Sequence, residues 1–215
     1  SLLLEETNVK TLAAYGEALC KKRVARAEDV THVMDCVKAL EQSDGKIAFR
    51  LLDMLCKLDA AILLPGLKAH VPGLLDYLSQ LDMQSAALTL LKKIATTLPD
   101  HLPKLYDILM ADFEAAVASG ANFRGDFAQR AAATLLKTVD AAVPSDRIPT
   151  LLEMLMRSDA CDGFLGMEPL LRKVDVAALS PDAVPALFEL LVHPNTRPEA
   201  ADLILFNTCS VREKA

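Results

Sequence analysis

A short phrase recurs four times along the chain and restricts its fold more than any other feature of the sequence. It reads aliphatic residue, proline, any residue, leucine, large apolar residue, acid, any residue, leucine. Proline fits the first turn of an α-helix, where its missing N–H has no partner to lose, and the apolar residues after it share one helical face. The phrase therefore predicts four helix starts. They lie at residues 70–78, 101–109, 147–155 and 183–191, with the repeat-defining prolines Pro72, Pro103, Pro149 and Pro185.

The spacing of these copies indicates how the helices are organised. The prolines are 31, 46 and 36 residues apart, an irregular period that is typical of stacked helix pairs with loops of variable length. Apolar residues also recur at helical spacing elsewhere, as at Leu51, Met54, Leu55 and Leu58, and no stretch alternates with the period of a β-strand. We predict an all-α fold: an α-solenoid of about five antiparallel helix pairs, forming a single helical-repeat domain over residues 1–215.

Short polar or proline-containing stretches predict the loops between ten or eleven helices. They fall near residues 27–29, 43–45, 64–66, 98–99, 119–122, 144–146, 158–159, 180–181 and 194–195.

Composition narrows the classes of function. Leucine and alanine dominate, 52% of residues are hydrophobic, aromatic residues make up only 5% and tryptophan is absent. The net charge of −6 weighs against a protein that binds nucleic acid mainly through phosphates, and the scarcity of aromatic rings weighs against base stacking. A mean hydropathy of +0.26 is high for a free monomer and suggests buried subunit contacts. No apolar run reaches the ~18 residues that span a bilayer.

The most basic stretch is the predicted contact for an anionic partner. It contains Lys21, Lys22, Arg23 and Arg26. These residues either complement the C-terminal end of the first helix or contact RNA phosphate, anionic lipid or an acidic protein. The smaller pairs Lys92-Lys93 and Arg172-Lys173 would strengthen the RNA interpretation if the folded chain aligned them on one face.

Residues that could carry chemistry are scattered. The five cysteines include no CxxC pair, and those in apolar helical patterns, Cys20, Cys36 and Cys56, are predicted to be small buried residues. His70 and His101 share one repeat position, which favours a role in capping or loop packing. We find no catalytic triad, zinc spacing or phosphate loop, and predict no catalytic residue, metal or cofactor.

Two stretches resemble known helical repeats. Residues 184–191, followed by Pro194-Asn195 and by residues 199–203, resemble an armadillo or HEAT repeat, and a looser likeness covers roughly residues 60–210. Residues 28–40 are similar to the heptatricopeptide and octotricopeptide repeats of organellar RNA-metabolism proteins. These resemblances imply a binding surface built from stacked helices.

The C-terminal stretch carries a separate likeness. Residues 202–215, with Asn207-Thr208-Cys209, resemble a segment of the radical-SAM tRNA methylthiotransferases, in which that cysteine ligates an iron–sulfur cluster. The resemblance implies that Cys209 is a cluster ligand. The family's other cysteine motifs are absent, and a cluster needs several thiolates, so the alternative is that this stretch ends the last helical repeat.

These observations favour a protein that binds rather than one that catalyses. We expect a non-catalytic helical-repeat scaffold, whose partners are other protein subunits of a larger complex. Because the sequence starts at Ser1, we also expect that a segment has been removed, which together with the organellar likeness suggests an intracellular, mitochondrial or other organellar location. The alternatives are an organellar RNA-binding repeat protein and a fragment related to a methylthiotransferase.

Overall fold

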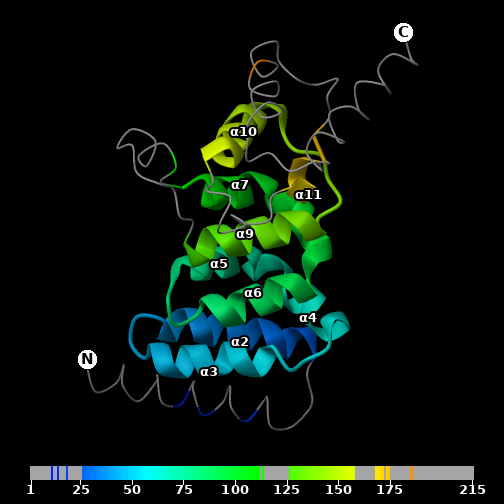
Figure 1. The fold of residues 1–215 in the computed structure, drawn as a ribbon. Coiled ribbons are helices and arrows are strands. Elements are labelled where there is room, and N and C mark those ends of the chain that lie inside the picture. Colours follow the sequence, from blue (N-terminus) through cyan, green and yellow to red (C-terminus); the bar gives the residue numbers. More distant parts are fainter. Residues whose placement is uncertain are drawn as a thin grey trace. The chain divides into compact units, whose positions relative to one another are not determined.

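The computed structural model confirms the all-α class over the residues that it describes. These are residues 26–111, 113, 126–157, 168–171 and 173–174, with Thr11, Ala14, Ala18 and Pro185. Every regular element among them is an α-helix or a 3-10 helix (Figure 1). The chain divides into two compact units, Ser1–His101 and Leu102–Ala215. The single repeat domain and the solenoid of five helix pairs stay predictions.

The first unit is built from α-helices and short 3-10 helices. Their order is α2 (Ala27–Leu40), α3 (Gly45–Leu55), α4 (Ala60–Leu67), η1 (Lys68–His70), α5 (Val71–Asp76), η2 (Tyr77–Ser79), α6 (Gln84–Lys93) and η3 (Ala95–His101). Helix α2 packs against both α3 and α4, and α6 packs against α3, α4 and α5 (Figure 1). The loop between α2 and α3 is short, so these two contacting helices are antiparallel. Asp44 begins α3, because its carboxylate accepts a hydrogen bond from Ile47 N at 3.2 Å.

The loop predicted at residues 64–66 is wrong. Pro65 lies inside α4, and the chain stays helical from Ala60 to Ser79 through the 3-10 turns η1 and η2. Proline removes one backbone hydrogen bond there, but Leu63 and Leu67 on either side of it are fully buried, and this packing holds the helix together. The chain leaves the helices instead at residues 56–59 and 80–83, so Leu58 lies beyond the end of α3.

The second unit contains α7 (Leu102–Met110), α9 (Phe127–Thr138), η4 (Ser145–Arg147), α10 (Ile148–Arg157) and α11 (Glu168–Leu171). Helix α9 packs against α7 and contacts α11. A reciprocal cap begins α9: Gln129 N donates to the Asp126 carboxylate at 2.9 Å, and Asp126 N donates to Gln129 Oε1 at 2.8 Å. The buried Gln129 amide also donates to the Ala111 carbonyl, which ties α9 to the end of α7.

Three copies of the proline phrase coincide with the start of an α-helix, and the first of them lies within the helical run that begins at Ala60. Pro72, Pro103 and Pro149 are each the second residue of an α-helix, and a 3-10 helix ends immediately before each of these helices. The prolines are exposed, whereas the paired apolar positions that follow are buried. Of the fourth copy, only Pro185 lies among the described residues, where it is helical and exposed.

The structure also shows a further copy of the phrase, without its proline, in α2. Val30 to Val37 has the same order of aliphatic, apolar and acidic residues, with Thr31 in place of proline. Val33 and Met34 occupy the paired apolar positions and are each 2% exposed, and Asp35 occupies the exposed acidic position. The predicted set of four missed this copy because it was aligned on the prolines.

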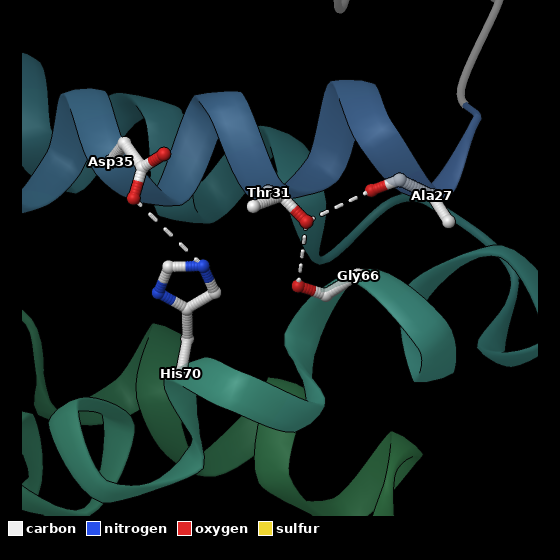
Figure 2. A network of polar contacts seen from close by, with 5 residues as sticks. All are labelled: Ala27, Thr31, Asp35, Gly66 and His70. Carbon is white, nitrogen blue, oxygen red and sulfur yellow. Dashed lines mark hydrogen bonds and ion pairs between the residues drawn. The ribbon is translucent and has the colours of Figure 1, made fainter.

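The contact between α2 and α4 depends on Gly66. A Cβ atom at Gly66 would lie 2.5 Å from the Ala27 carbonyl oxygen and 2.7 Å from Val30 Cβ, so only glycine allows the two helices this close together. The Thr31 hydroxyl lies 3.2 Å from the carbonyl oxygens of both Ala27 and Gly66 and can donate to either (Figure 2). This hydroxyl joins the backbones of the two helices.

We expect Gly66→Ala to destabilise the protein and Gly73→Ala to stabilise it. A methyl group at Gly66 forces α2 and α4 apart, at a cost of about 1–3 kcal/mol for overpacking. A methyl group at Gly73 meets no atom within 4 Å, so removing a helical glycine there should add about 0.5–1 kcal/mol. Urea unfolding of both variants measures the difference. Equal effects would contradict the close contact at Gly66.

Candidate functional site

A groove lies between α2 and the second helical run of the first unit. Its volume is about 350 Å³. One wall is a stripe of α2 with residues three and four positions apart, which share a helical face. The other wall is a similar stripe along η1, α5 and η2. The lining residues are Met34, Lys38 and Glu41 on the first wall, and Ala69, His70, Pro72, Gly73, Asp76, Tyr77 and Gln80 on the second.

Two polar contacts join the walls. His70 Nε2 lies 4.0 Å from Asp35 Oδ1 (Figure 2), and the Glu41 carboxylate lies close enough to the Tyr77 hydroxyl to raise its pKa. The partners are six residues apart on the first wall and seven on the second, or ~9 Å and ~10 Å at the helical rise of 1.5 Å per residue. Because the later residue of one wall contacts the later residue of the other, the two walls run parallel.

Tyr77 lies at one end of the groove, beside Glu41. Its side chain is 4% exposed. Burial raises the pKa of its hydroxyl well above the ordinary value of 10.0, and the neighbouring Glu41 carboxylate raises this pKa further. Tyr77 is therefore neutral at physiological pH.

Gly73 leaves the groove open. It holds the variable position of its phrase, where the next two copies carry Lys104 and Thr150. No atom lies within 4 Å of where its Cβ would be, so the packing does not require glycine there, unlike at Gly66. A side chain at this position would extend into the space between the walls.

The second unit repeats one of the two contacts between walls. Arg147 Nη2 lies 2.8 Å from Asp107 Oδ1. Arg147 stands two residues before the proline of its phrase, as His70 does, and Asp107 is the phrase acid of the preceding copy, as Asp35 is. In these two copies the residue two positions before the proline therefore faces the acid of the preceding copy, which is more specific than the predicted capping or loop packing.

In both units a lysine side chain donates hydrogen bonds to backbone carbonyls at or just beyond a helix C-terminus. Lys93 Nζ donates to the Leu58 carbonyl at 2.7 Å, just beyond α3. Lys173 Nζ donates to the carbonyls of Leu136 and Lys137, each at 2.8 Å, and to that of Val139, at the end of α9. Burial lowers the pKa of Lys173, while the Asp140 charge acts in the opposite direction. One lysine of each basic pair considered for RNA binding therefore satisfies backbone carbonyls.

The predicted basic contact is described only at Arg26. Lys21, Lys22 and Arg23 lie outside the described residues, as do Arg172 and Cys209. Arg26 is the exposed residue that precedes α2, and its backbone N–H donates to the Asp29 carboxylate at 3.0 Å. Arg26 precedes the N-terminal end of α2, where a cation gains nothing from the helix dipole.

The two described cysteines are free thiols. Cys36 is buried, as predicted, and burial raises its pKa. Cys56 is half-buried, and its Sγ–H donates to the Ala86 carbonyl at 3.4 Å. Burial and the Asp53 charge raise the pKa of Cys56 to about 11, although Lys93 and Lys57 act in the opposite direction. Cys20 lies outside the described residues.

The described residues hold neither a metal site nor a helix that could cross a membrane. Among them, no three side chains of histidine, cysteine, aspartate or glutamate are grouped as a metal site would require. No helix in the described ranges combines the length and apolarity needed to cross a membrane. Comparison of the chain with protein-family models, curated proteins and solved structures finds no match.

Lys93→Met should lower the free energy of unfolding by ~1–2 kcal/mol, because it leaves the Leu58 carbonyl without its charged donor. Lys92→Met is the matched control, since Lys92 is exposed on the same helix and should change stability by less than about 0.5 kcal/mol. Urea unfolding compares the two variants. Equal losses of unfolding free energy in the two variants would show that the hydrogen bond from Lys93 to the Leu58 carbonyl does not stabilise the protein.

Cys56 should react slowly with iodoacetamide. A pKa of about 11, against an ordinary 9.0, reduces its thiolate fraction near neutral pH by ~100-fold. Mass spectrometry of the native protein alkylated at pH 8, with the same reaction in urea as control, measures the rate at Cys56. A native rate close to the rate in urea would contradict the raised pKa.

Proposed function

We propose that this chain is a non-catalytic helical-repeat scaffold that binds another protein, as a subunit of a larger, organellar assembly. In this proposal its helix pairs continue as an α-solenoid of armadillo or HEAT type. The observation that carries the proposal is the groove between α2 and α5, whose walls are joined by polar contacts at both ends. A preformed groove binds a partner without first having to order its own walls, which favours affinity.

Several polar side chains are engaged in contacts within the fold, which supports a structural scaffold over a catalytic site. Thr31, His70, Lys93, Gln129 and Lys173 all contact a backbone or side chain of another helix or helix end. Each therefore has a structural role that accounts for its presence. The groove is one surface that the described part of the first unit offers to a partner.

The RNA-binding alternative is less favoured. Lys93 and Lys173 donate to backbone carbonyls, so their charges are directed at the protein itself. A chain of net charge −6 would then depend on its remaining cations to attract phosphate.

Site-specific photocrosslinking in the native cells tests the proposed function. The full chain carries a photoreactive amino acid at Gln80, on the exposed rim of the groove, or at Lys46, exposed on α3, as control. We expect one discrete protein adduct at Gln80 and none at Lys46. A crosslink to RNA at Gln80 would contradict the proposal. So would the absence of any crosslink together with elution of the protein as a free monomer in size-exclusion chromatography.

A further inference from the structure

We infer that each compact unit contains one copy of the same module, in which a lysine of a second helix pair locks the end of a first helix pair, so that the two pairs open together. The pairs are α2 with α3 and α5 with α6 in the first unit, and α7 with α9 and α10 with α11 in the second. This module is independent of the proposed function, because it concerns only how the helix pairs are held together.

A second sequence phrase recurs at the ends of α3, α6, α9 and α11. It reads leucine, leucine or cysteine, basic residue, variable residue, and it covers residues 55–58, 90–93, 135–138 and 170–173. The variable residue alternates along the chain. It is Leu58 and then Lys93 in the first unit, and Thr138 and then Lys173 in the second. In each unit the lysine therefore belongs to the second helix pair and stands 35 residues after its counterpart in the first pair.

Both lysines donate hydrogen bonds to the end of the first pair. Lys93 Nζ lies 2.7 Å from the Leu58 carbonyl oxygen, just beyond α3. Lys173 Nζ donates to three carbonyls at the end of α9, at 2.8 Å for the first two: those of Leu136, Lys137 and Val139. The last carbonyls of an α-helix have no partner within that helix, and a cation is favourable beside them. The second pair therefore supplies the charged donor that the end of the first pair lacks.

The first pair does not supply this donor itself. Leu58 has no side-chain donor, and the Thr138 hydroxyl donates to the Leu135 carbonyl of its own helix at 2.7 Å. The carbonyls that follow Leu135 are thus left to Lys173. The alternation in the phrase matches this division, with the acceptor in the first pair and the ammonium donor in the second.

Other contacts between the pairs recur in the same way. Asp35 of α2 lies 4.0 Å from His70, and Asp107 of α7 lies 2.8 Å from Arg147. His70 and Arg147 each end the 3-10 helix that comes before the second pair. The second helices of the pairs also meet, α6 with α3 and α11 with α9. Each unit therefore has the same three contacts between its two pairs, which supports one module present twice.

Hydrogen exchange of the full chain, followed by NMR, tests whether the lysine locks the two pairs. Lys173→Met should speed exchange about tenfold in the last turn of α9 as well as in α11, because it removes the charged donor that joins them. Lys93→Met should have the same effect at the end of α3 and in α6. Two matched controls should leave exchange unchanged within about twofold: Lys92→Met, exposed on α6, and Lys57→Met, whose partner is the exposed Asp53.

Lys93→Arg and Lys173→Arg keep the positive charge but change the shape of the donor. They should speed exchange at the same amides by less than the methionine variants do, and they replace a methionine variant that does not fold. Faster exchange only in the helix that carries the substituted lysine would overturn the lock between pairs, as would an equal effect of Lys57→Met. An effect of Lys93 without one of Lys173, or the reverse, would overturn the equivalence of the two units.

Discussion

The close contact of α2 with α4 at Gly66 is the constraint on which the first unit depends. A Cβ there would lie 2.5 Å from a backbone oxygen of α2, so the two backbones approach as closely as glycine permits. Thr31 then joins them through its hydroxyl (Figure 2). Since the chain stays helical from α4 to η2, this contact also fixes where α5 runs beside α2. The groove, with its contacts at Asp35–His70 and Glu41–Tyr77, follows from that placement.

Local chemistry allowed a large part of the fold to be predicted. A proline at the second helical position favours the start of an α-helix without any tertiary partner, and Pro72, Pro103 and Pro149 each stand there, Pro72 within a longer helical run. Pro65 was misread as a loop because its context is tertiary: the burial of Leu63 and Leu67 keeps the helix intact around it.

The candidate site depended on contacts that sequence patterns do not show. Glu41 and Tyr77 lie far apart in the sequence, and only the parallel course of two helices brings them together. Lys93 looked like a surface cation, but its partner is a carbonyl 35 residues earlier. One pattern in the sequence could have indicated these contacts. When the phrase is aligned on its acid instead of its proline, Asp35 and Asp107 take the same position. Their partners, His70 and Arg147, also share one repeat position.

The central claim is that α2 and α4 touch at Gly66 and so set the walls of the groove. A three-dimensional NOE experiment on methyl-labelled full chain tests this contact directly. Strong cross-peaks between the methyl protons of Val30 and the Hα protons of Gly66 are expected, because Val30 Cγ1 lies 2.9 Å from where a Cβ of Gly66 would be. Their absence, in a spectrum where other core contacts of α2 are present, would contradict the account.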